Sequence, residues 1–163
     1  PLHYGLNLAE ELCKDAKKKV KSMVKGDELP ASALALHKVQ DSFVSDLEQL
    51  KAKTLNSKAW DLYAGPYLLN EVDHLIEKLT ILKAESDKSD GYKGIGKLRQ
   101  IISESFRDKS TTAFMMQRMK QINNQLYTSL DLDKDLESIE YHGKTMLFDL
   151  ITLHSLNYGN KYN

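Results

Sequence analysis

The sequence predicts an all-α protein, a single compact antiparallel bundle of five or six helices formed by residues 1–163. Leucine is abundant, with 25 leucines against 13 valines and isoleucines, and β-branched residues suit strands better than helices. Glycines and prolines are few and leave long stretches without a helix breaker. Within those stretches apolar residues recur every three or four positions, and no alternating run of strand length appears. A chain of 163 residues is long enough to bury a core of its own.

The first three helices are predicted from this spacing. Apolar residues at helical intervals predict a helix over residues 6–24, with Cys13 on its buried face. Pro30 is favoured in the first turn of a helix, and the apolar period after it predicts a second helix over residues 36–50. The same period predicts a third helix over residues 60–82.

Two breakers divide the middle of the chain. Pro66 is expected to kink the third helix or to split a short turn from it, because proline lacks the amide hydrogen of a helix interior. Residues 86–96 are rich in Ser, Asp, Lys and Gly, a composition typical of loops. We expect this loop to be a hinge between two halves of the bundle.

The remaining helices follow the loop. The apolar period predicts helices over residues 95–106 and 115–126, with a turn at residues 108–110 whose Ser110 caps the second of them. A last helix is predicted over residues 132–153. The expected architecture is therefore helical from one end of the chain to the other.

Charge and cysteine content exclude several classes of protein. The chain carries 23 basic and 23 acidic residues, so it has no global attraction for nucleic acid or anionic lipid. The longest stretch free of charged residues, Leu150 to Asn160, is shorter than the roughly 18 apolar residues of a membrane-spanning helix. A single cysteine excludes an internal disulfide and any multi-cysteine zinc site. The composition fits an intracellular and a secreted or surface-displayed protein alike, and because the sequence starts at Pro1 we expect a processed or excised form.

One pair of residues has the spacing of a metal centre. Glu71 and His74 lie three residues apart, as in di-iron carboxylate bundles. Such a centre needs a second Glu-x-x-His motif, which the sequence lacks. We therefore predict that His74 is a surface histidine near Glu71 and that the protein holds no metal or other cofactor. A metal-dependent bundle enzyme is the less favoured alternative.

Two other patterns match ligand-binding loops incompletely. Residues 91–97 have the glycine and lysine spacing of a phosphate-binding loop, but Leu98 replaces the Ser or Thr that binds magnesium. Residues 131–135 alternate aspartates like a calcium loop, but Leu136 replaces the required glycine. We interpret the glycines as supplying positive φ and a helix start, and the aspartates as favourable charges in a first helical turn.

No arrangement of residues in the sequence indicates catalysis. Cys13 is the one candidate thiol nucleophile, and its place on the apolar stripe predicts burial in the core as a small hydrophobe. Met115, Met116 and Met119 have helical spacing, and we expect them to fill gaps in the core rather than to form an adaptable binding surface. We predict that the protein is not an enzyme.

The basic residues are unevenly distributed. All three arginines fall between residues 93 and 120, where four lysines join them against two acidic residues. The guanidinium group binds carboxylate or phosphate through two parallel hydrogen bonds, so clustered arginines favour recognition of an anionic partner. A second run, residues 14–25, has six lysines against one aspartate, and we interpret it as a solvated helix face.

Three hypotheses explain the first basic segment. The favoured one is a non-enzymatic interaction module that binds another protein, one with an acidic patch, through an exposed helical face. Its predicted contact residues are Tyr92, Lys93, Lys97, Arg99, Arg107, Arg118 and Lys120. The alternative is a nucleic-acid-binding bundle, in which the basic residues contact phosphates and Tyr92 stacks on a base. The third is internal pairing with residues 131–140, where five acidic residues accompany one lysine.

Overall fold

The computed structural model describes residues 2–24, 29–39, 46–88 and 91–159, and for residues 2, 91, 92 and 157–159 it describes the backbone alone. Eight helices and one two-stranded sheet occur in these ranges. The helices are α1 (Leu2–Met23), α2 (Leu47–Thr54), α3 (Leu69–Ser86), α4 (Gly91–Ser105), α5 (Lys109–Ile122), α6 (Asn124–Ser129), α7 (Leu132–Ser138) and α8 (Leu147–Gly159). The strands β1 (Ala33–Leu34) and β2 (Tyr67–Leu68) pair antiparallel. The predicted helical class is confirmed, whereas the predicted bundle of five or six helices is not.

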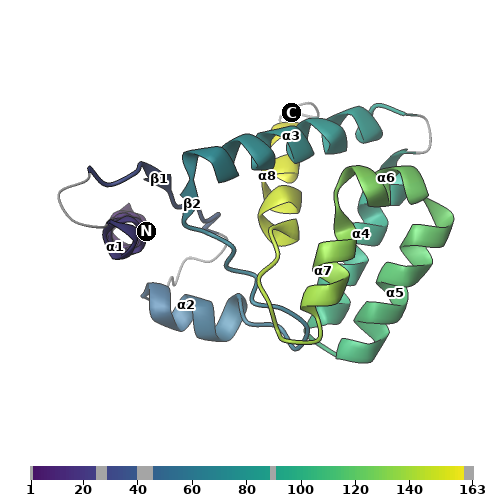
Figure 1. Ribbon diagram of the computed structural model, residues 1–163, viewed down its shortest axis with the longest axis horizontal. Coiled ribbons are helices and arrows are strands. Elements are labelled where there is room, and N and C mark those ends of the chain that lie inside the picture. Colours follow the sequence, from purple (N-terminus) through teal and green to yellow (C-terminus); the bar gives the residue numbers. More distant parts are fainter. Residues whose placement is uncertain (1, 25–28, 40–45, 89–90, 160–163) are drawn as a thin grey trace.

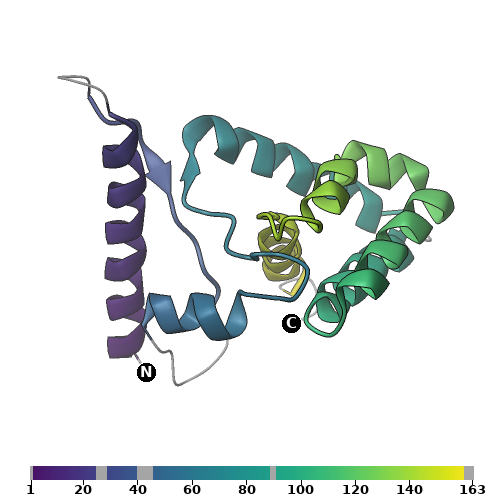
Figure 2. The same ribbon diagram turned by 60° about the horizontal axis from the view of Figure 1, so that its bottom comes forward.

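The elements gather in two groups. Figure 1 shows α1, β1 and α2 on one side and α4, α5, α6 and α7 on the other, with α3 running across the top and α8 near the centre. Figure 2 shows α1 standing apart from the other long helices, next to β1 and α2. The α4–α7 group therefore forms one face of the molecule that is remote from α1.

The core is centred on Trp60, which is fully buried. Its indole Nε1 donates a hydrogen bond of 2.9 Å to the carbonyl oxygen of Asp135, a residue of α7. Tyr127 and Leu130 are also fully buried and belong to the same core. An indole N–H usually has a hydrogen-bond partner when it is buried, so this bond joins the segment before β2 to α7.

Short polar side chains cap three of the helices. Asp46 accepts a hydrogen bond from the amide of Gln49 at the start of α2. Asp108 accepts one of 2.6 Å from the amide of Thr111 at the start of α5, and Asn123 caps α6. The prediction that Ser110 caps α5 is wrong. Asp108, two residues before Ser110, accepts the hydrogen bond from the free amide, and its negative charge is favourable at the positive end of the helix.

The predicted helix over residues 36–50 is also wrong. Residues 29–39 contain β1 and no helix, and residues 40–45 lie outside the described residues. Helix α2 begins at Leu47, after its Asp46 cap. Apolar residues of this stretch still pack on the core: Leu36 does so outside any helix, and Leu47 and Leu50 do so from α2.

The third and last predicted helices are each broken. Residues 62–66 form no helix, so α3 starts only at Leu69. The helix predicted over residues 132–153 is divided into α7 and α8. The backbone of His142 lies in the left-handed region with φ of 56°, which a right-handed helix cannot contain. Local backbone geometry therefore interrupts an apolar period that continues in the sequence.

Two further predictions are wrong. Cys13 is exposed, because α1 contacts the rest of the chain through a narrower stripe that buries Leu8, Leu12 and Val20 instead. Residues 91–96 belong to α4 and not to the predicted loop 86–96. The hinge and the single domain formed by residues 1–163 stay predictions.

Candidate interaction groove between α4 and α5

A groove of about 500 Å³ lies where α4 and α5 pack side by side. Both helices lie in the group at the right of Figure 1. The floor is apolar and consists of Ile101 on α4 with Met115 and Met119 on α5, and the exposed Ile122 also lines the groove. Three cationic residues, Lys93, Lys97 and Arg118, also line it. The groove thus combines an apolar floor with basic edges.

Helical periodicity explains why these residues meet. Lys93, Lys97 and Ile101 are spaced by four residues, which places them on one face of α4. On α5, Met115 and Met119 have the same spacing. The turn at residues 106–108 folds α5 back beside α4, so the two faces border one groove.

A glycine permits close packing at one end of the groove. A Cβ atom on Gly94 would lie 3.0 Å from Cδ2 of Leu126, which is tighter than ordinary van der Waals contact. Nearby, Asn123 Nδ2 donates a hydrogen bond of 3.0 Å to Glu85 Oε1. The Lys88 ammonium, with the Asn123 amide, holds the pKa of Glu85 below its usual range. A charged, hydrogen-bonded group therefore lies next to Gly94 and Asn123, which both line the groove.

Apolar surface continues along the outer edge of α5. Phe114 is 60% exposed and Ile122 is 64% exposed. The two residues lie four positions before and after Arg118, so all three share one face of the helix. Phe114 and Ile122 are two of several large apolar side chains exposed in the described residues, and Ile122 also lines the groove.

The structure brings together three of the seven predicted contact residues. Lys93, Lys97 and Arg118 line the groove. Lys97 Nζ lies 3.2 Å from Gln100 Oε1 on the same helix. Within the described part of the chain, the Arg118 guanidinium has no hydrogen bond or ion pair. An arginine beside apolar surface is thereby available to a partner carboxylate.

Lys120 forms an ion pair with another residue of the chain. Its Nζ atom lies 2.8 Å from Oδ1 of Asp133 on α7 and 5.4 Å from the centre of the Tyr127 ring. Lys109 donates a hydrogen bond of 2.8 Å to the carbonyl of Glu140. The pairing predicted between the basic segment and the acidic residues of 131–140 is therefore present for Lys120, whereas Lys109 contacts a backbone carbonyl of that stretch.

Two of the other predicted contact residues, Arg99 and Arg107, do not line the groove. Burial lowers the pKa of His154 on α8, and the nearby charge of Arg99 adds to this effect, so Arg99 lies on the side of α4 that faces α8. Arg107 is exposed in the turn after α4. The side chain of Tyr92 lies outside the described residues. Sequence spacing alone did not distinguish Arg99 and Arg107 from the three predicted residues that line the groove.

The two residues of the predicted metal motif each contact other side chains or backbone groups. Glu71 Oε2 accepts hydrogen bonds from the Leu68 amide at 2.7 Å and from Lys19 Nζ at 3.1 Å. His74 is exposed, as predicted, and its Nδ1 lies 3.4 Å from Glu77 Oε2. In the ranges that the structure covers, no three His, Cys, Asp or Glu side chains lie close enough to hold a metal ion.

Residues of the incomplete phosphate-loop and calcium-loop patterns belong to helices. Residues 91–97 are helical, so they form no loop around a phosphate, and Gly94 and Gly96 show no positive φ. Asp133 and Asp135 lie in the first turn of α7, as the interpretation of helix-end charges predicted. Burial raises the pKa of Asp135 to about 6, so this residue is part of the core and not of an ion site.

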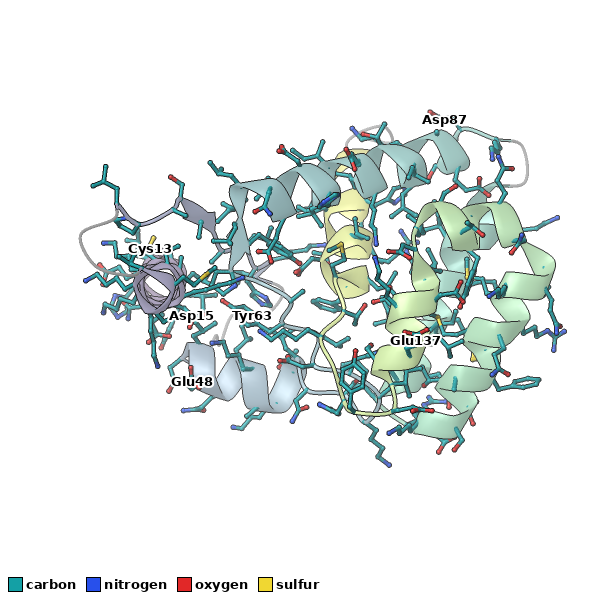
Figure 3. The ribbon with its side chains drawn as sticks, viewed as in Figure 1. Cys13, Asp15, Glu48, Tyr63, Asp87 and Glu137 are labelled. Atoms are coloured by element: carbon teal, nitrogen blue, oxygen red, sulfur yellow. The ribbon has the colours of Figure 1, made fainter. Side chains whose placement is uncertain are left out.

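A second polar cluster fastens α1 to the rest of the chain. Tyr63 donates a hydrogen bond of 2.8 Å to Asp15, and the Lys51 ammonium lies 3.2 Å from the same carboxylate and 4.4 Å from the centre of the Tyr63 ring. Figure 3 labels Asp15 and Tyr63, which face each other beside α1. Lysines border the adjoining hollow of about 380 Å³, but Lys19 and Lys51 bind carboxylates of the chain. We assign this cluster to the packing of α1.

A half-buried serine and a buried histidine form a pair that the sequence did not reveal. Ser86 Oγ lies 2.6 Å from His154 Nε2 and also donates to the carbonyl of Leu82 at 3.0 Å. A hydroxyl has a single proton, so with that proton on the carbonyl the oxygen accepts from the imidazole. The arrangement stabilises the contact of α3 with α8 and leaves the serine poorly placed as a nucleophile.

No protein-family model matches the chain, and comparison with curated proteins and with solved structures also finds no match. No helix in the described ranges has both the length and the apolar character needed to cross a bilayer. Fold and groove together define a helical protein with one basic-edged apolar groove between α4 and α5. The function is inferred from that groove.

Proposed function

We propose that this protein is a non-enzymatic interaction module that binds an acidic region of another protein in the groove between α4 and α5. The observation that carries the proposal is the joining of apolar and cationic side chains at one place. Ile101, Met115 and Met119 form a floor next to Lys97 and Arg118. Burial of apolar area favours association by about 25 cal/mol for each Å², and charge complementarity adds specificity and a faster association rate.

The apolar floor favours a protein over a nucleic acid. Nucleic-acid affinity comes mainly from contacts between phosphates and many cationic groups. Here Lys120 is paired with Asp133, and exposed Phe114 and Ile122 extend the groove. Interface cores are enriched in methionine and arginine, and Met115, Met119 and Arg118 line this groove.

The nucleic-acid alternative has its own test. Retention on immobilised DNA that falls steeply with salt, and that is lost when Arg99, Arg107 and Arg118 are changed to alanine, would support it. Our proposal predicts weak retention that these three changes scarcely alter. The measurement is the salt concentration at which the wild-type chain and the triple variant elute.

The proposal is tested by selection of peptides from a displayed random library on the immobilised full chain. We expect enriched peptides that bind the wild-type chain and bind Lys97→Glu/Arg118→Glu at least ten times more weakly, because both changes place a negative charge at the groove. Arg99→Glu/Arg107→Glu is the matched control, since neither residue lines the groove. Enriched peptides that lose affinity for the control pair and not for the groove pair would contradict the proposal.

A further inference from the structure

We infer that the partner segment in this groove is an amphipathic α-helix with acidic residues beside its apolar stripe. The inference rests on the proposed function and specifies the partner. Three properties of the groove carry it: the nature of its walls, the length of its apolar face, and the position of its charges.

The walls of the groove are both helices, α4 and α5. Backbone amides and carbonyls within a helix are already bonded to one another, so these walls offer no ladder of backbone partners to an extended strand. A strand docked here would bury backbone groups without partners, which is unfavourable. A helix satisfies its own backbone and presents only side chains, as in other helix-in-groove complexes.

The length of the apolar face suits two to three turns of helix. Ile122 lines the groove, and Phe114, on the same face of α5, extends the apolar surface beyond the lining residues. The two are eight residues apart, which at 1.5 Å per residue is about 12 Å. Apolar side chains at positions i, i+4 and i+7 of a partner helix span about 10 Å. Met115 and Met119 lie between these ends on the groove floor, and flexible methionine side chains adapt to the shape of an inserted residue.

The charges lie on both walls. Arg118 belongs to α5, whereas Lys97 belongs to α4. A helix in the groove therefore has a cation on each side of its apolar stripe. Glutamates that flank the stripe would meet these cations, and the Arg118 guanidinium has the planar geometry for a two-bond contact with a carboxylate.

The test uses three synthetic 16-residue peptides with a fluorescent label and the full chain. The first carries leucines at i, i+4, i+7 and i+11 with flanking glutamates. The second has the same composition with the leucines spread around the helix. The third replaces the flanking glutamates of the first by lysines. Fluorescence anisotropy gives the dissociation constant of each.

We expect the first peptide to bind at least ten times more tightly than the other two. Arg118→Glu and Lys97→Glu should each weaken it about tenfold or more, and the double variant should bind the lysine peptide better than the wild-type chain does. Lys120→Glu is the matched control, because Lys120 pairs with Asp133 and does not line the groove. Circular dichroism confirms that each variant is folded.

Several results would overturn the inference. Equal binding of the first two peptides would show that a helical apolar stripe is not recognised. Binding that survives both groove variants would place the peptide elsewhere, and self-association of the chain lost in Arg118→Glu would make a second copy the occupant. If the library selects groove-dependent peptides without a helical period, the inference fails and the proposed function stands; if no selected peptide depends on the groove, both fail.

Discussion

The ammonium of Lys120 lies 2.8 Å from the carboxylate of Asp133 and so ties α5 to α7. Arg118, two residues earlier, lines the groove instead. Successive residues of a helix point about 100° apart, so two positions direct side chains to different faces. One basic segment of the sequence is thereby divided between internal pairing and a surface for a partner.

This division predicts different effects of two charge reversals. Lys120→Glu should lower the melting temperature slightly, because it places two carboxylates together, and should leave peptide binding unchanged. Lys120→Glu/Asp133→Lys should restore the melting temperature. Arg118→Glu should do the opposite, with an unchanged melting temperature and loss of binding. Thermal unfolding followed by circular dichroism measures the stability; a large fall for Arg118→Glu would show that this arginine has a structural role.

Two glycines of α4 form a matched pair. Gly96 has no atom near enough to touch an added Cβ, whereas a Cβ on Gly94 would lie 3.0 Å from Leu126. Alanine favours a helix over glycine by about 1 kcal/mol, so Gly96→Ala should raise the free energy of unfolding by about 0.5 to 1 kcal/mol. Gly94→Ala should be less stable than Gly96→Ala by about 1 kcal/mol or more, because the gain is offset by the close contact. Urea denaturation measures both, and equal values would contradict the packing described for Gly94.

Asp149 predicts a dependence of stability on pH. Burial raises the pKa of its carboxyl to about 6, although the hydrogen bond of 2.5 Å from Tyr67 favours the charged form. In the unfolded chain an aspartate has a pKa of about 3.9. Between pH 4 and 6 the folded state therefore binds more protons than the unfolded state, so stability from this group falls as pH rises through this range.

The corresponding test is Asp149→Asn, which removes the titration and keeps an oxygen that accepts from Tyr67. The variant should be more stable than the wild-type chain at pH 7.5 by roughly 2 to 3 kcal/mol and nearly equal to it at pH 4. Chemical denaturation at both pH values measures the difference. A difference that is the same at pH 4 and pH 7.5 would contradict the assigned pKa.

Trp60 is predicted to be a major anchor of the core. Trp60→Phe removes the indole hydrogen bond to the Asp135 carbonyl and leaves both a cavity and a buried carbonyl without that partner. We expect a loss of about 2 to 4 kcal/mol in the free energy of unfolding. Phe114→Ser is the control, since Phe114 is exposed and its loss should affect binding and not stability. Urea denaturation followed by circular dichroism measures both variants.

Helical periodicity was sufficient to predict the helical class and several helices. The helix predicted over residues 6–24 corresponds to α1, and the one over 95–106 corresponds to α4. Such helices have continuous amphipathic faces. Helix ends were less predictable because they depend on caps such as Asp108 and on backbone geometry such as that of His142.

The groove was only partly predictable. Residues 93, 97 and 118 were among the predicted contacts, since charge is visible in sequence. The exposure of Phe114 and Ile122 was not, because an apolar residue at helical spacing looks the same whether another element covers it or not. Likewise, the burial of Met116 and Met119 agrees with the prediction, yet Met119 also reaches the groove floor. Only the packing of α4 against α5 decides these points.

The most direct test of the groove uses the five methionines of the chain as probes. Methyl-labelled methionine gives one NMR signal for each, and Met115 and Met119 lie in the groove while Met23 and Met146 do not. On titration with the acidic amphipathic peptide, we expect the Met115 and Met119 signals to shift and to saturate together, while the Met23 and Met146 signals stay unchanged. Saturable binding that moves Met23 or Met146 and leaves Met115 and Met119 in place would contradict it.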